Sequence, residues 1–210
     1  MAKKALKRGV LLTFEGPEGS GKSTQVRLLC SWLRRKGFSV LRLREPGSTR
    51  VGEKIRKILL NPSHKGMDVV CEMLLYQAAR AQLVKEKVLT ALGKKQIVIL
   101  DRYLDATVCY QGYGAGLDIG QIKKIGRLAT YGCDPDLTIL LDLEVREGLR
   151  RARRLDRMEK KPIKFHSRVR KGYLALAKKD RRRIKVVKVA PLISETQRRI
   201  RSIVGAKIGG

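Results

Sequence analysis

The sequence has too few metal ligands for a zinc-stabilised domain. Its 210 residues include only two histidines and four widely spaced cysteines, which are Cys30, Cys71, Cys109 and Cys133. A structural zinc site needs about four such ligands at short, regular spacing, and the chain has no CxxC pair. We therefore expect reduced thiols, with no structural metal and no disulfide framework.

Long hydrophobic runs are also missing. No window approaches the roughly 18 apolar residues that a membrane-spanning helix requires. Residues 1–8 are basic and precede an apolar stretch, as in a secretory signal, but the apolar run breaks at Glu15. We therefore expect a basic N-terminal tail, no membrane partner and a cytoplasmic location.

Acidic and aromatic residues are scarce. Lys and Arg total 48 against 19 Asp and Glu, which gives a net charge of +29. From Glu144 onward the chain has 23 basic and 6 acidic residues. Such a charge attracts polyanions of any kind, including nucleotides, RNA and anionic lipid. Three Phe and one Trp leave few platforms for stacking bases, and no recognition motif for nucleic acid is present. Nucleic acid is therefore expected only as a non-specific electrostatic partner.

Short apolar runs rich in β-branched residues alternate with longer helical patterns. The runs cover 10–15, 39–43, 97–100, 137–142 and 184–189, and most are near-continuous, as in strands buried on both faces. Helical patterns cover 23–36, 51–60, 68–92, a segment after 104, 118–130 and 163–179. The alternation predicts an α/β fold of three layers, a five-stranded parallel sheet with helices on both faces. Since no linker or repeat divides the chain, we expect residues 1–210 to form one domain.

A glycine-rich segment between the first expected strand and helix fits the phosphate-binding pattern G-x-x-x-x-G-K-[ST]. Its residues are Gly16, Pro17, Glu18, Gly19, Ser20, Gly21, Lys22, Ser23 and Thr24. In this context the glycines let backbone N–H groups surround phosphate oxygens, and the helix N-terminus adds partial positive charge. We expect ATP here, with Lys22 on its β- and γ-phosphates and the Ser23 hydroxyl on Mg²⁺. The pattern predicts a P-loop NTPase fold but identifies only a protein that binds nucleoside triphosphates.

A second group of polar residues, Asp101 and Arg102, ends the third expected strand. Carboxylates at the carboxyl end of a strand beside the P-loop strand hold magnesium in P-loop proteins, so Asp101 is a candidate metal ligand with Ser23. The alternative is that Asp101 only caps the next helix. A guanidinium beside the sheet needs an anionic partner, and a phosphate is the natural one for Arg102.

Several short blocks together resemble the thymidylate kinase family. The specific ones are Arg-Glu-Pro-Gly at 44–47 and Asp-Arg-Tyr at 101–103 followed by Tyr-Gln-Gly at 110–112. Supporting blocks are 53–56, 75–80 and 153–157, and all of them lie in the family's order between about residues 10 and 175. Ser48 departs from the pattern, because the family often has glycine there. The resemblance implies an ATP:dTMP phosphotransferase that needs Mg²⁺, serves dTTP synthesis and forms a homodimer.

The resemblance also implies a role for each residue of the dTMP site. Tyr76 and Arg80 are four residues apart, so they share one face of a helix, where an aromatic ring can stack on thymine and a guanidinium can donate to its carbonyl. The alternative is that Tyr76 belongs to the core and Arg80 to the surface. Arg102 would hold the dTMP phosphate. The rest of the pocket would come from Glu45 and Pro46 at the phosphate end, Tyr110 under the deoxyribose and Gln111 near the base. Tyr110 can also be ordinary packing.

The resemblance further implies a catalytic arginine beside Lys22 and Arg102. The P-loop carries none, whereas the segment expected to form a short mobile lid, about 144–162, is rich in arginine. Arg153 is the first choice for the residue that neutralises charge on the phosphoryl group in transit. The alternative is a solvated basic lid in which no single arginine matters. Residues 150–161 look too polar for the core.

Two rival functions remain open at this point. One is a kinase for another nucleoside or nucleoside monophosphate. The other is a basic P-loop protein that binds nucleic acid through its net charge of +29. The intact set of Lys22, Ser23, Asp101 and Arg102 argues against a binding protein without catalysis.

Overall fold

Five short strands form one parallel sheet, which confirms the expected fold class. The computed structural model describes residues 6–151 and 156–209. The strands lie in the order β2-β3-β1-β4-β5, and every neighbouring pair is parallel. In chain order they are β1 Val10–Glu15, β2 Val40–Arg44, β3 Ile97–Asp101, β4 Leu137–Asp142 and β5 Ile184–Lys188. Each bound lies within one residue of the sequence-based expectation.

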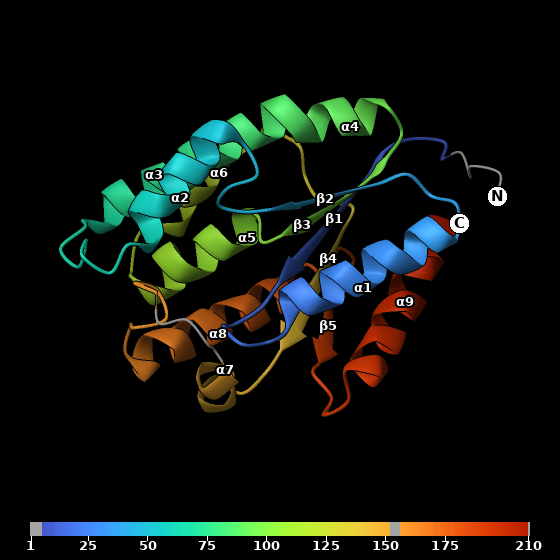
Figure 1. Ribbon diagram of the computed structural model, residues 1–210. Coiled ribbons are helices and arrows are strands. Elements are labelled where there is room, and N and C mark those ends of the chain that lie inside the picture. The colour runs from blue at the N-terminus through green and yellow to red at the C-terminus, as the bar shows by residue number, and fades with distance from the viewer. Residues whose placement is uncertain (1–5, 152–155, 210) are drawn as a thin grey trace.

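Helices cover both faces of this sheet (Figure 1). The α-helices are α1 Lys22–Arg35, α2 Arg50–Leu60, α3 Val69–Leu83, α4 Leu89–Gly93, α5 Leu104–Thr107, α6 Ile119–Ala129, α7 Val145–Arg151, α8 Ile163–Lys179 and α9 Ile193–Gly209. Two π-helical segments, η1 Val84–Val88 and η2 Val108–Gly114, continue α3 and α5 without a break. α1 and α9 pack on one face, while α3, α4, α5 and α8 lie on the other.

The strand pattern explains how the buried hydrophobic residues divide between the two faces of the sheet. Successive side chains of a strand point to opposite faces, so Leu12 and Phe14 of β1 join the core under α1 and α9, whereas Leu11 joins the core under α3 and α4. β1 is buried at all six positions because it has a neighbour on both sides and helices on both faces. The edge strands β2 and β5 contain exposed residues instead. The near-continuous apolar runs therefore mark the central strands.

Two helices were not predicted from the sequence. α7 begins the segment expected to be a lid, and α9 closes the chain on the outer face of the sheet. The single helix expected over 68–92 is an unbroken helical segment, but its middle turn is the π-helical η1. Within the described residues, no helix is both long and apolar enough to cross a membrane.

The strand order places the polar residues along one edge of the sheet. In the register of the parallel pairs, Phe14 of β1 and Arg44 of β2 both lie beside Asp101 of β3. The P-loop that follows β1 and the Arg-Glu-Pro-Gly segment that follows β2 therefore emerge on either side of Asp101. Parallel α/β sheets bind ligands at this carboxyl-terminal edge.

Candidate active site

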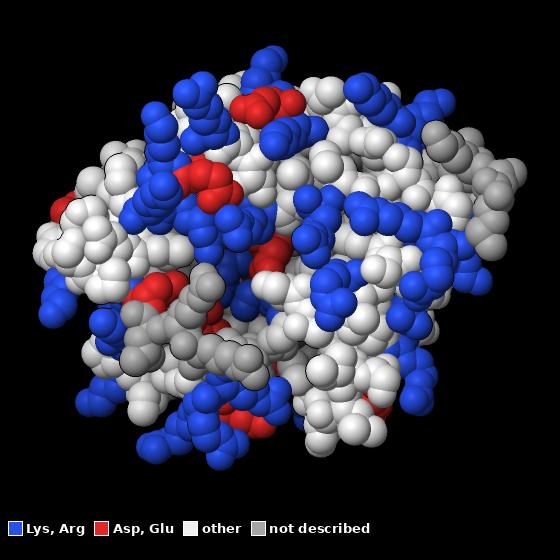
Figure 2. Space-filling model, viewed as in Figure 1, with Lys and Arg blue, Asp and Glu red and all other residues white. Residues whose placement is uncertain are grey.

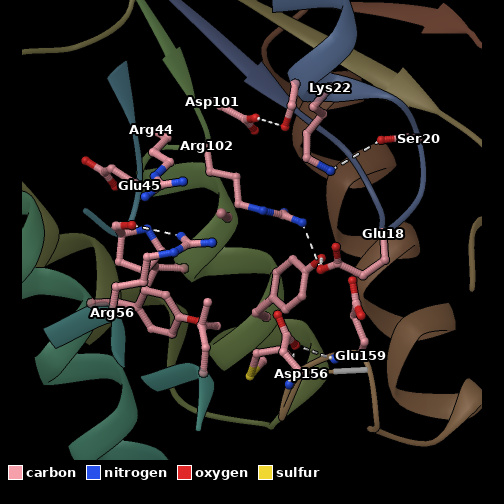
Figure 3. A pocket seen from close by; sticks show the side chains of 18 of the residues that line it. Glu18, Ser20, Lys22, Arg44, Glu45, Arg56, Asp101, Arg102, Asp156 and Glu159 are labelled. Carbon is pink, nitrogen blue, oxygen red and sulfur yellow. Dashed lines mark hydrogen bonds and ion pairs between the residues drawn. The ribbon is translucent and has the colours of Figure 1, made fainter. Parts of the chain in front are cut away.

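A cavity of about 400 Å³ opens at the carboxyl-terminal edge of the sheet (Figure 3). Its walls come from the P-loop, the segments after β2 and β3, the helices α2, α3 and α5, the π-helical η2 and the segment that leads into α8. The cavity thus brings together residues that are far apart in the sequence. Of the described residues expected in the site, the lining includes Glu18, Gly19, Ser20, Gly21, Lys22, Ser23, Thr24, Glu45, Pro46, Tyr76, Arg80, Asp101, Arg102, Tyr110 and Gln111. Arg153 lies outside the described residues.

The conformation of the P-loop depends on its glycines, and the Lys22 side chain is hydrogen-bonded to the loop backbone. Gly19 has φ of +66°, and a Cβ there would lie 1.9 Å from the carbonyl oxygen of Gly148 on α7. Lys22 Nζ donates to the carbonyl oxygens of Gly16 at 3.0 Å and Pro17 at 2.8 Å. Burial, together with the nearby charge of Arg102, lowers the pKa of Lys22 to about 8. The carboxylates of Glu18, Asp101 and Glu15 only partly oppose this lowering, and a phosphate would favour the charged form of the ammonium further.

Ser23 and Asp101 form a pair of oxygen ligands. The Ser23 hydroxyl donates to Asp101 Oδ2 at 2.6 Å, and both residues line the cavity. A hydroxyl and a carboxylate are the hard donors that Mg²⁺ prefers. Among residues 6–151 and 156–209, no group of three or more His, Cys, Asp or Glu side chains is placed to hold a metal. The donor set thus fits an ion that takes its remaining ligands from phosphate and water.

Arg102 lies at the centre of the cavity, between the P-loop and α3 (Figure 3). Its Nη2 donates to Glu18 Oε1 at 2.8 Å, and its Nη1 donates to Tyr173 Oη at 3.2 Å. The guanidinium carbon lies 5.0 Å from the ring centroid of Tyr110, whose hydroxyl donates to the same Glu18 oxygen at 2.6 Å. Arg102 has φ of +71°, which is uncommon for a non-glycine residue. Strain of this kind is concentrated at functional sites.

Glu18 keeps its charge in this arrangement. Its burial alone would raise the pKa, but Arg102 and then Lys22 outweigh that effect and lower the pKa of Glu18 to about 2. The carboxylate therefore neutralises the guanidinium of Arg102. An incoming phosphate would compete with Glu18 for the same guanidinium.

A second carboxylate lies beneath the cavity. Glu15, at the end of β1, is fully buried and accepts from the backbone N–H of Tyr103 at 2.7 Å and from Tyr173 Oη at 2.8 Å. Burial and then the charge of Asp105 raise the pKa of Glu15 to about 8, although Arg102 opposes them. Tyr173 thus connects Glu15 to Arg102.

One face of α3 forms the far wall of the cavity. Arg80 is only 1% exposed, and its guanidinium donates to Glu45 Oε2 at 2.8 Å and to Gln77 Oε1 at 2.6 Å. It donates further to the carbonyl oxygen of Tyr103 at 3.1 Å and to Thr107 Oγ1 at 3.0 Å. Arg80 is therefore a buried residue whose guanidinium is fixed by hydrogen bonds, and not a surface residue. Tyr76, one turn earlier, is half-buried and also lines the cavity.

Several lining residues were not identified from the sequence. Arg44 pairs with Glu53 at 3.0 Å, and Arg56 donates to the carbonyl oxygen of Pro46 at 2.9 Å. Both arginines belong to sequence blocks that carry the family resemblance, so those blocks could have identified them as site residues. Ser48 adopts φ of +66°, the conformation that favours glycine, and its Oγ exchanges hydrogen bonds with the backbone of Arg44.

The expectation that residues 150–161 are too polar for the core is wrong for Arg157 and Met158, which are both buried. Arg157 pairs with the buried Glu72 at 2.5 Å and donates through Nε to the carbonyl oxygen of Leu59 at 2.8 Å. A charged side chain can be buried where a partner of opposite charge accompanies it. The partner lies on α3, so the sequence around Arg157 gave no sign of it.

The chain is similar to thymidylate kinases in both sequence and structure. The family model described as thymidylate kinase matches residues 14–200. A thymidylate kinase of Caldanaerobacter subterraneus subsp. tengcongensis is 47% identical over 173 residues, which is 81% of this chain and 83% of the relative. The crystal structure of a thymidylate kinase from Ehrlichia chaffeensis is similar with a TM-score of 0.78 and 30% identity, over 94% of this chain and 99% of that one.

Proposed function

This chain belongs to the thymidylate kinase family, and we propose that its cavity transfers the γ-phosphoryl group of ATP to dTMP. The observation that carries the proposal is the arrangement of the cavity. Figure 3 shows Arg102 between Lys22 and Asp101 on one side and Glu45 on the other. Ser23 is hydrogen-bonded to Asp101, and Arg80 of α3 is paired with Glu45. A triphosphate and a monophosphate can therefore meet at Arg102.

At the ATP end, the P-loop binds the phosphates through residues Gly16 to Thr24. Lys22 moves from its bonds to the loop carbonyls onto the β- and γ-phosphate oxygens, where its charge is stabilised. Ser23 and Asp101 would hold Mg²⁺, which supplies charge neutralisation at the transferred phosphoryl group. The attacking group is an ionised phosphate oxygen, so no general base is needed.

At the dTMP end, Arg102 leaves Glu18 to bind the dTMP phosphate, and Glu18 is then free to contact the sugar. Glu45 and Pro46 shape this end of the cavity. Tyr76 stacks on thymine, Arg80 donates to a carbonyl of the base, and Gln111 reaches its edge. Tyr110 lies beneath Arg102 and packs under the deoxyribose. These roles follow from the family resemblance and from the lining of the cavity.

The lid and the assembly are further parts of the proposal. The segment 144–162 closes over the nucleotides and supplies Arg153 to the phosphoryl group in transit, which excludes water from the reaction. A second copy of the chain covers α3, whose outward face carries Val70, Leu74 and Ala78 and no charged side chain. We further propose a cytoplasmic location.

The test is ADP formation from ATP and Mg²⁺ with dTMP, dUMP, dCMP, UMP, GMP and thymidine offered separately. We expect the highest kcat/KM with dTMP and its loss in Lys22→Ala, because that substitution removes the phosphate-binding ammonium. Equal rates for all monophosphates, or activity that survives Lys22→Ala, would refute the proposal.

A further inference from the structure

Glu72 of α3 makes two contacts that the proposed reaction does not use. Its Oε1 accepts from Gln111 Nε2 at 2.7 Å, and its Oε2 pairs with Arg157 Nη1 at 2.5 Å. Glu72 and Arg157 are both buried, and neither lines the cavity. The contacts join α3, the π-helical η2 and the segment that leads into α8. Glu72 is therefore a buried link between a residue of the cavity and the base of the lid.

The pairing with Arg157 dictates how the Gln111 amide is turned. A carboxylate paired with a guanidinium offers acceptors only, so the amide can direct only its NH₂ group towards Glu72. The carbonyl oxygen of the amide must then face the other way. Gln111 lines the cavity, and none of the described residues donates a hydrogen bond to Gln111 Oε1. The cavity is thus presented with an acceptor at a fixed position.

Arg80 is fixed by a second buried carboxylate in a matching way. Glu45 accepts from its Nε, and the described residues engage four of the five N–H groups that a guanidinium carries. The remaining N–H belongs to Nη1. Glu72, Tyr76 and Arg80 follow each other at four-residue spacing, so they share one face of α3. The cavity lining therefore includes, besides the Tyr76 ring, one acceptor on Gln111 and one donor on Arg80 whose positions are fixed.

We propose that Glu72 is a positioning residue that locks the Gln111 amide and so makes the cavity select thymine over cytosine. The inference rests on the proposed function. Thymine presents a donor at N3–H beside an acceptor at O4, which matches the acceptor of Gln111 and the donor of Arg80. Cytosine presents an acceptor at N3 beside an amino group, so both contacts would oppose like groups. A buried hydrogen-bonding group that is left unpaired, or faces a like group, strongly rejects the wrong ligand.

The test is Glu72→Gln, with the Kd of dTMP, dUMP and dCMP measured by calorimetry without ATP. The new amide must give its oxygen to Arg157, because a guanidinium only donates. Its NH₂ group then faces Gln111, whose amide has to turn and present Nε2 to the cavity. We expect the preference for dTMP over dCMP to fall about tenfold or more. The ratio of dTMP to dUMP stays unchanged, because uracil has the same N3–H and O4.

Two further variants separate the lock from general damage to the fold. The combination of Glu72→Gln with Arg157→Met leaves no buried charge without a partner. The Gln111 amide is still free to turn in this variant, so the preference for dTMP over dCMP should fall there too. In a Gln111→Leu background, Glu72→Gln changes that preference no further. An equal loss of affinity for all three nucleotides, or a wild type that binds dCMP as well as dTMP, would overturn the inference. A wild type that binds dTMP selectively but does not phosphorylate it would refute the proposed function alone.

Discussion

At the scale of single residues, the clearest consequence of the site concerns the proton on Lys22. Burial and Arg102 lower the pKa of this ammonium to about 8 in the free protein. Phosphate oxygens beside Nζ favour the charged form and raise the pKa on binding. At about pH 8.5 ATP should therefore bind with net uptake of part of a proton. Calorimetry in buffers of different ionisation enthalpy measures that uptake.

The matched control for this measurement is Lys22→Arg, since a guanidinium stays charged in both states. The uptake seen with the wild type should be lost in that variant, while protonation of ATP itself contributes equally to both. Equal uptake in the two proteins would show that Lys22 is already charged before ATP binds.

Glu15 predicts how stability depends on pH. Its pKa rises from 4.5 in the unfolded chain to about 8 in the folded protein, first because of burial and then because of Asp105. Between these values the folded state holds the proton that the unfolded state has lost, so the free energy of unfolding falls as pH rises. Glu15→Gln cannot ionise and escapes this loss, which amounts to a few kcal/mol at most.

Urea unfolding of both proteins at about pH 5 and about pH 8 checks this prediction. The wild type should lose stability relative to Glu15→Gln as the pH rises from about 5 to about 8. A difference in stability that does not change with pH would show that Glu15 titrates normally in the folded protein.

Single residues also show where sequence reasoning stops. The four-residue spacing of Tyr76 and Arg80 suffices to place them on one helix face, because that periodicity is local. The sequence cannot show that Arg80 is held by Glu45, or that Arg157 is buried against Glu72, because these partners are brought together only by the fold. Motifs therefore predict the chemistry of the cavity, while its supporting contacts require the structure.

At the scale of elements, α7 and the P-loop touch through their backbones. A Cβ on Gly148 of α7 would lie 2.3 Å from the carbonyl oxygen of Glu18. Gly148→Ala must therefore push α7 away from the loop that binds phosphate. We expect kcat/KM with ATP to fall about tenfold or more, because small displacements of binding groups are costly in catalysis. Steady-state kinetics measures this effect.

Gly93→Ala is the control for that substitution. Gly93 ends α4, and no atom lies within 4 Å of the Cβ that alanine would add. Its kinetics should match the wild type, so a helical Gly→Ala change alone has no effect. If Gly148→Ala also behaved as the wild type, the contact between α7 and the P-loop would not matter for catalysis.

The helices and strands differ in how well the sequence predicted them. All five strands were predicted to within one residue, and in the central ones burial on both faces leaves a continuous apolar run. α9 was missed because its apolar positions, such as Ile200 and Val204, alternate with arginines that hide the stripe. The π-helical η2, which carries Tyr110 and Gln111, leaves no periodic signal of its own.

At the scale of the whole molecule, the net charge of +29 should govern how nucleotides arrive. Lys and Arg side chains spread over much of the face that Figure 2 shows, with few acidic residues among them. A field of this sign draws anionic substrates towards the cavity, and salt screens it. We expect kcat/KM for dTMP to fall severalfold between about 50 mM and about 500 mM KCl, with a smaller change in kcat. An unchanged kcat/KM would show that the charge plays no part in substrate capture.

The same charge acts in the opposite direction on the proposed dimer. Two chains of +29 repel each other, so association must come from burial of apolar surface. The outward face of α3 offers such a surface, and its Leu74 is 48% exposed. Salt screens the repulsion, so the dimer should tighten at the ionic strength that lowers kcat/KM for dTMP. Leu74→Asp buries a charge in the interface and should give monomers in sedimentation velocity. Leu192→Asp, at a residue 66% exposed before α9, should leave the dimer intact. Monomers in the wild type at all salt concentrations would refute the assembly, and an intact Leu74→Asp dimer would place the interface elsewhere.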